Sequence, residues 1–175
     1  MTAADPAADL PIEIHDAETI VRAVKTPHHV NPAETRIRPS AFRPAPGHTV
    51  LSVMRQLMGD DFCKDKGVEI CGNEYIGLAA IAAAEVRRPG SLVVDYRDDF
   101  LGHAHIDHQL PAIQRNEPPP PDLLQQLDDR CKKLAAAAVF HKDPSPTVPS
   151  WAGSALRLAS LPGERPPPVD LRPPV

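Results

Sequence analysis

The spacing of apolar and polar positions predicts several short strands in the first two thirds of the chain. These stretches are rich in β-branched side chains or continuously apolar, and Gly or Pro lies near many of their ends. Strands are expected over residues 18–25, 75–81 and 91–96, and residues 102–108 are expected to form a further strand or a strand-to-loop transition. Residues 49–58 begin with β-branched side chains and end in helix formers, which predicts a strand that passes into a helical turn. Residues 82–88 favour a helical turn for the same reason. This pattern indicates an α+β fold with a small mixed or antiparallel sheet and short helices.

Proline limits what residues 35–42 can form. Pro39 cannot donate a hydrogen bond to a neighbouring strand, so this stretch can be a strand only at the edge of a sheet. We therefore expect a short extended piece there.

The clearest helix is predicted over residues 122–141, directly after the run of prolines at 118–121. Asp122 and Gln125 have the spacing of a capping box. Apolar residues then recur with the helical period, at Leu124, Leu127, Cys131, Leu134 and Ala138. This stripe needs a cover, which is either the domain itself or a partner. We single out Leu124, Leu127 and Leu134, together with Trp151 further on, as candidate partner-binding residues.

Proline content divides the chain into regions. Of 22 prolines, 14 lie at or after Pro111, and runs of proline favour extended conformations over a packed core. We expect a flexible arm at 1–10, an α+β core domain at 11–115 and a proline linker at 116–121. The amphipathic helix at 122–141 and a largely disordered proline-rich tail at 142–175 would follow, with Trp151 as an anchor.

Charge and composition exclude some classes of protein. The net charge of −4 argues against a nucleic-acid-binding protein, which normally presents a basic surface. No apolar run is long enough to cross a membrane, and residues 1–10 lack the pattern of a signal peptide. Three cysteines without a CxxC pair do not form a disulfide framework. We expect a cytoplasmic protein.

The sequence His-Ala-His-Ile-Asp-His at 103–108 contains the most chemically suggestive residues. Side chains two apart on a strand share a face, so His103, His105 and Asp107 are expected to point together. Imidazole and carboxylate groups suit a divalent transition metal such as zinc. We therefore take His103, His105, Asp107 and His108 as candidate metal ligands.

This run resembles the H-x-H-x-D-H motif of the metallo-β-lactamase superfamily. The resemblance implies that His103 and His105 bind one metal, and that Asp107 and His108 help to bind a second. It covers six residues only, and after His108 the chain offers a single further histidine, His141. The sandwich fold of that superfamily needs more downstream ligands and more chain than this sequence provides, so only a metal site of another kind is expected.

A second cluster could bind an anion. Arg22 lies on the first predicted strand, and Arg36, Arg38 and Ser40 lie in the proline-interrupted segment. The planar guanidinium group suits phosphate or carboxylate, although arginines beside an edge strand also keep that edge from aggregating.

Three functional hypotheses follow. The first is a non-catalytic binding or accessory module that acts through a protein partner or as a homo-oligomer, using the helix at 122–141 and the tail. The second is a small metal-dependent hydrolase or phosphoesterase with ligands in 103–108. The third is a nucleotide-handling enzyme that uses Arg22 and residues 36–43. Sequence features alone favour the first.

Overall fold

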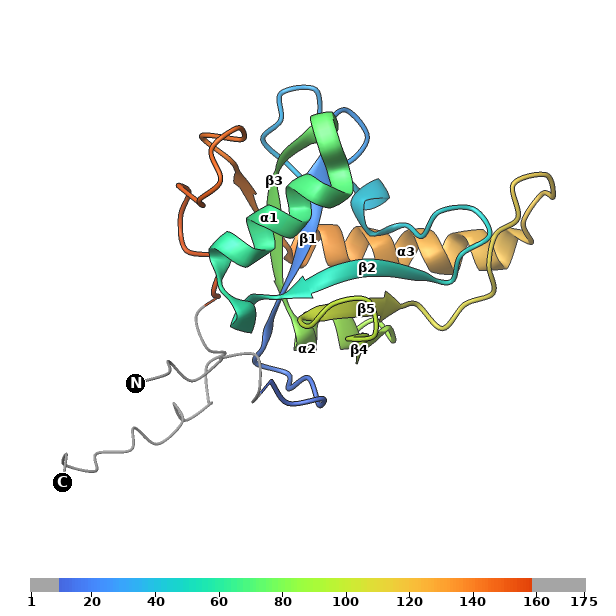
Figure 1. Ribbon diagram of the computed structural model, residues 1–175. Coiled ribbons are helices and arrows are strands. Elements are labelled where there is room, and N and C mark those ends of the chain that lie inside the picture. The colour runs from blue at the N-terminus through green and yellow to red at the C-terminus, as the bar shows by residue number, and fades with distance from the viewer. Residues whose placement is uncertain (1–9, 159–175) are drawn as a thin grey trace.

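The computed structural model describes residues 10–158 (Figure 1). The strands are β1 (Thr19–Lys25), β2 (Val50–Arg55), β3 (Tyr75–Ala82), β4 (Leu92–Asp95), β5 (His103–Asp107) and β6 (Val139–Lys142). The α-helices are α1 (Asp60–Cys71), α2 (Ala83–Arg87) and α3 (Pro121–Ala137). Three short 3₁₀ turns, η1 (Pro39–Phe42), η2 (Gln56–Met58) and η3 (Gly72–Glu74), complete the set.

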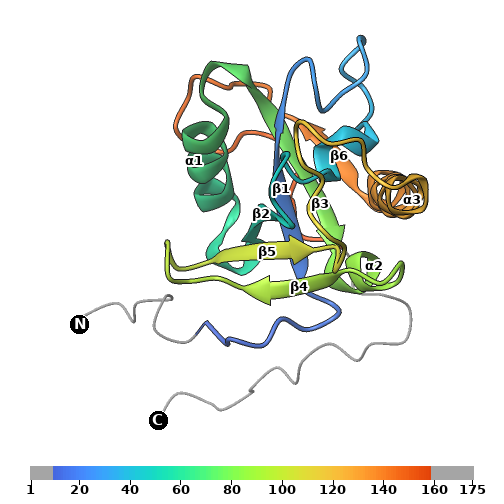
Figure 2. The same ribbon diagram turned by 90° about the vertical axis from the view of Figure 1, so that its right-hand side faces the viewer.

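All six strands join one antiparallel sheet in the order β4-β5-β2-β1-β3-β6. The predicted α+β class with an antiparallel sheet is therefore confirmed. β4 and β6 are the two edge strands. Figure 2 shows α1 on one side of the sheet and α3 on the other, with β4 and β5 below them.

Each face of the sheet has its own core. On the α3 side, Ile20, Val53, Ile81 and Ile106 pack with Leu134. On the α1 side, Val21, Ala23, Met54 and Leu78 pack with Cys63. Alternate residues of β1 thus enter different cores, as the two-residue period of a strand requires.

Helix α1 and strand β6 were absent from the sequence prediction, and a glycine explains how each of them fits. A Cβ atom at Gly67 of α1 would lie 3.1 Å from side-chain atoms of both Leu78 and Tyr75, so glycine lets this helix approach β3 closely. A Cβ atom at Gly77 of β3 would lie 2.3 Å from the carbonyl oxygen of His141. Only glycine fits there while β6 pairs with β3.

The helix predicted over 122–141 ends earlier in the structure. α3 stops at Ala137, and Ala138 has an extended backbone that leads into β6. Residues 139–142 gain backbone pairing with β3 in place of a last helical turn. The sheet therefore includes residues from both sides of the segment at 116–121.

Residues 35–42 do not form the edge strand that the sequence allowed. Residues 39–42 form η1, which begins at Pro39, and proline is well suited to the first turn of a helix. The preceding Ile37 forms only an isolated bridge with Val30.

Part of the segment expected to be a disordered tail packs on the domain. Leu156 is fully buried in the α1-side core, and Trp151 packs against its margin. The Lys64 ammonium donates hydrogen bonds to the carbonyl oxygens of Ser145 and Ser150. The expected arm at 1–9 and the remainder of the tail at 159–175 lie outside the described residues.

No helix within residues 10–158 is long and apolar enough to cross a membrane.

Candidate functional site

A histidine and aromatic cluster lies on β5 and the neighbouring loop. The rings of His103 and His105 lie edge to face, with centroids 4.8 Å apart. Tyr96 stacks on His105 at 4.1 Å, and Phe100 stacks on His103 at 4.6 Å. The strand period thus places the two histidines on one face, as the sequence predicted.

His103 is the unusual member of this cluster. The residue is 3% exposed, and neither of its ring nitrogens forms a hydrogen bond with good geometry within residues 10–158. Its Nδ1 atom lies 3.3 Å from Oδ2 of Asp99, which forms an ion pair with the ring only when the imidazole is protonated. Burial, and then the neighbouring charge of His105, lower the pKa of His103. The ring is therefore neutral near pH 7 and offers an unused nitrogen.

The four predicted metal ligands do not come together. Oδ1 of Asp107 accepts a hydrogen bond from the backbone N–H of Gln109, at 2.7 Å. His108 lies beyond the end of β5, and its ring contacts the carbonyl oxygen of Phe42 and the thiol of Cys131, which belong to the α3-side core. In the part of the chain that the structure describes, no group of three or more His, Cys, Asp or Glu side chains is placed to hold a metal ion.

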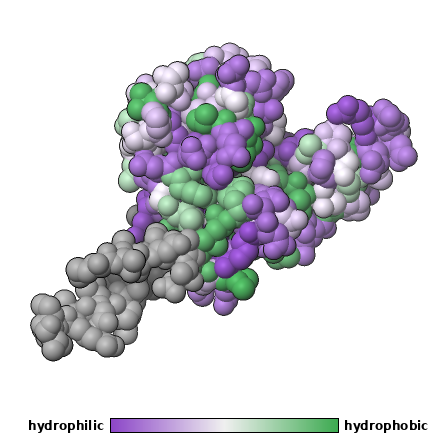
Figure 3. All heavy atoms as spheres, in the orientation of Figure 1, coloured by the Kyte–Doolittle hydropathy of each residue, from purple (hydrophilic) through white to green (hydrophobic). Residues whose placement is uncertain are grey.

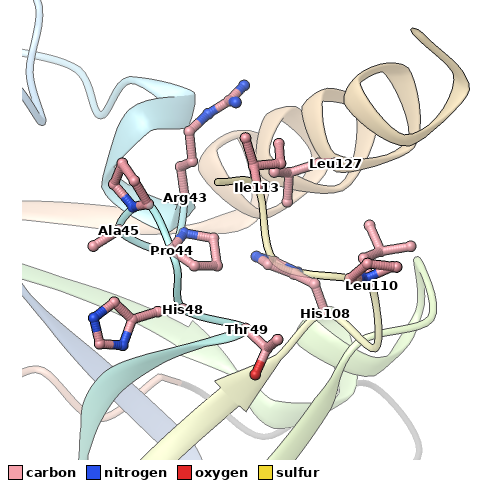
Figure 4. A pocket seen from close by; sticks show the side chains of 11 residues that line it. Arg43, Pro44, Ala45, His48, Thr49, His108, Leu110, Ile113 and Leu127 are labelled. Carbon is pink, nitrogen blue, oxygen red and sulfur yellow. The ribbon is translucent and has the colours of Figure 1, made fainter. Parts of the chain in front are cut away.

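His108 instead forms part of a small apolar pocket of about 140 Å³ (Figure 4). The pocket lies between the loops at 43–49 and 108–113 and the start of α3. Ile113 and Leu127 lie near each other on one wall, and Pro44 is on another. Arg43 forms an ion pair with Asp128 of α3 at the rim. A cavity of this size accommodates a single apolar side chain or a benzene-sized molecule.

Buried hydrogen bonds fix His108 beside this pocket. Its Nε2 atom lies 2.7 Å from the carbonyl oxygen of Phe42, which can only accept, so Nε2 carries the proton. Nδ1 then accepts from the hydroxyl of Ser91, at 2.8 Å. Cys131 donates its S–H to the same Phe42 carbonyl, and burial raises the pKa of this thiol to about 11.

The Ser91–His108 pair has the spacing of a hydrolase dyad but a different role. Both residues are about 1% exposed, so a substrate cannot reach the serine oxygen. Burial lowers the pKa of His108, which keeps the ring neutral. We interpret this group as a satisfied polar network that joins η1, α3 and the end of β5.

The residues of the predicted anion-binding cluster do not come together either. The Arg22 guanidinium donates to the carbonyl oxygens of Ala41, at 3.0 Å, and Ser52, at 2.7 Å, and so ties η1 and β2 to β1. Ser40 donates its hydroxyl proton to the carbonyl of His28. Arg36 and Arg38 are exposed. Only these two of the four residues remain available to a ligand.

The predicted partner-binding residues mostly serve the domain itself. Leu127 and Leu134 are buried in the α3-side core, and Leu124 is half-buried. Trp151 donates its indole N–H to the carbonyl of Ser154, at 2.9 Å, and lies against the α1-side core. The apolar stripe of α3 is thus covered by the domain itself, which is one of the two covers that the sequence left open.

A different apolar surface is open instead. Leu92, Val94 and Tyr96, on and just after β4, are 40%, 47% and 41% exposed. Val93 between them is buried, so this strand is apolar on both faces while only one face is covered. In the sequence, this open surface is visible only as a strand with apolar residues on both faces. That pattern is also typical of a fully buried strand, so it does not reveal an exposed face. Figure 3 shows apolar side chains reaching the surface between polar regions.

A groove of about 580 Å³ follows the outer edge of β4. Residues 93–95 form one side, and residues 12–16 form the other. Arg87 holds the second side in place, because it donates to the Asp16 carboxylate and to the carbonyl of Ile14. The exposed side chain of Ile12 also lines this groove.

Comparison with protein-family models, curated proteins and solved structures finds no match for this chain.

Proposed function

We propose that this chain is a non-catalytic protein-binding module that uses the edge of β4. The observation that carries the proposal is the exposed row Leu92, Val94 and Tyr96 on an edge strand. Natural edge strands are usually protected by lysines, prolines, bulges or a covering segment. Leu92, Val93 and Val94 include no lysine or proline, and the only charge on β4, Asp95, forms ion pairs with Arg55 and Arg97.

The occupant proposed here is an extended, apolar segment of another protein. Such a segment would pair with the backbone of β4 as a seventh strand and lie in the groove beside residues 12–16. Its alternate side chains would contact Leu92 and Val94. The ring of Tyr96, stacked on His105, offers a flat apolar surface at the end of this row.

Peptide selection tests this proposal. A random peptide library is panned against the immobilised full chain and counter-selected with the Leu92→Lys/Val94→Lys variant. Enriched peptides should alternate apolar residues and bind at least about tenfold more weakly to that variant. The matched control is Ile70→Lys/Val148→Lys, which changes two similarly exposed residues elsewhere. Enriched peptides that bind all three proteins equally, or no enrichment, would overturn the proposal.

A metal-dependent hydrolase is the second candidate function, and the unpartnered nitrogen of buried His103 beside His105 favours it. Substrate, water or a partner would have to supply further ligands. Calorimetric titration of the untagged chain with zinc chloride separates the two candidates. Stoichiometric binding that is lost in His103→Ala/His105→Ala supports the hydrolase, and no binding removes it.

A further inference from the structure

A second groove, of about 450 Å³, lies at the opposite edge of the sheet beside β6. The loop before η1 contributes Arg36 and Ile37, and the last turns of α3 contribute Lys132 and Ala135. Phe140 comes from β6. Figure 2 shows β6 next to α3, the two elements that carry Phe140 and Lys132. The β4 surface lies at the other end of the sheet, so the two surfaces are independent.

The charged residues of this groove are all positive. Arg36 and Lys132 line it, and Arg38 is adjacent in sequence; all three are exposed. Within residues 10–158 none of them forms an ion pair with a carboxylate. Lys142 of β6 differs, because Glu34 holds its ammonium at 2.7 Å. A chain with a net charge of −4 therefore presents unneutralised cations around one groove.

The remaining lining of the groove is largely apolar. Ile37 and Phe140 are half-buried and pack against Val24, Val30 and Ala79. On the α3 side, the groove is lined by the short side chains of Ala135 and Ala136. β6 is the last strand of the sheet, and its edge away from β3 has no strand partner among the described residues.

We propose that this groove binds an extended segment of a partner protein in which carboxylate side chains alternate with apolar ones. Arg36 and Lys132 would receive the carboxylates, the guanidinium through paired hydrogen bonds and the ammonium as a point charge. The apolar side chains would contact Ile37 and Phe140.

Charge and shape favour such a peptide over nucleic acid. Nucleic-acid affinity comes mainly from many phosphate contacts, and this groove offers two lining cations. The half-buried Phe140 and Ile37 would leave apolar surface facing phosphates. A segment with both acidic and apolar side chains can pair with the cations of the groove and also cover its apolar residues.

The test uses fluorescein-labelled peptides and the full chain. The probe is an octapeptide that alternates glutamate with valine, and its binding is measured by fluorescence anisotropy. Two comparison peptides alternate lysine with valine and glutamate with serine. The glutamate–valine peptide should bind at least about tenfold more tightly than either of them. Addition of this peptide should change the amide chemical shifts of residues 35–39 and 132–140, and it should not change those of β4.

Charge reversal provides the second arm. Arg36→Glu/Lys132→Glu should weaken binding of the glutamate–valine peptide at least about tenfold. The matched control, Arg115→Glu/Arg157→Glu, makes the same change in net charge at exposed residues outside the groove and should leave binding within about twofold. Ala136→Glu, an exposed substitution in the α3 wall, should also weaken binding.

Four results would overturn the inference. They are no binding of the glutamate–valine peptide, equal loss in the two charge-reversal variants, shifts that map to β4, and tighter binding of a thymidine oligonucleotide at the same groove.

Discussion

At the scale of single residues, buried ion pairs connect segments that are distant in sequence. Lys64 of α1 is 1% exposed in its side chain and lies 3.0 Å from Asp143, which is also buried. The same carboxylate accepts a hydrogen bond from the hydroxyl of Tyr75, at 3.0 Å. Arg55 plays a similar role, because it pairs with Glu18 and Asp95 and also donates to the carbonyl of Pro11. These ties fix both ends of the described chain to the sheet.

Lys64→Ala should destabilise the fold strongly, because it leaves the Asp143 carboxylate buried without a cation. We expect a loss of about 3–5 kcal/mol in the free energy of unfolding, measured by urea denaturation. The control is Lys66→Ala on the same helix, whose partner Glu69 has a side chain that is 66% exposed. This control should cost about 1 kcal/mol or less. Equal effects of the two substitutions would contradict the role assigned to Lys64.

At the scale of elements, close approach decides which segments join the sheet. β6 has only four residues, and its pairing with β3 passes directly over Gly77. α1 lies against β3 at Gly67. Neither helix period nor strand alternation reveals such contacts, because each depends on a neighbour distant in sequence.

Gly77→Ala should detach β6, because the new methyl group would overlap the carbonyl oxygen of His141. We expect a destabilisation of about 1–3 kcal/mol and faster amide hydrogen exchange across residues 139–142. Gly67→Ala is the matched comparison, since its methyl group would meet only side-chain atoms at 3.1 Å, which can shift slightly. It should leave exchange in β6 unchanged. Protection of β6 that survives Gly77→Ala would show that the strand does not depend on this contact.

At the scale of the whole molecule, burial of histidines couples the fold to pH. Burial is the main cause that lowers the pKa of five of them: His29, His103, His105, His108 and His141. The largest effect is at His29, whose pKa falls to about 3 through burial and the nearby charges of Arg22 and Lys25. Below about pH 6.5 the unfolded chain takes up protons that the native chain does not, so stability falls as pH falls.

The free energy of unfolding should therefore decrease between pH 7 and pH 5, as measured by urea denaturation at each pH. His29 alone should contribute about 2 kcal/mol of this loss, since its folded-state pKa lies below the whole interval. His29→Asn should flatten the profile by about that amount. If the free energy of unfolding of His29→Asn falls with pH as steeply as that of the unsubstituted chain, His29 does not have the role assigned to it.

The sequence by itself determined the fold class, the five strands β1–β5 and the shared face of His103 and His105. These features follow from local propensity and from the two-residue period of a strand, which neighbouring residues define. It also identified the amphipathic stripe of α3, but not what covers it.

Only the tertiary structure decided the rest. It placed Leu127 and Leu134 against their own sheet, separated His108 from His103, and directed Arg22 to backbone carbonyls. It also left β4 open on one face and gathered Arg36, Lys132 and Phe140 around one groove. These outcomes depend on which distant segments meet, and strand order, burial and charge pairing are fixed only when the sheet assembles.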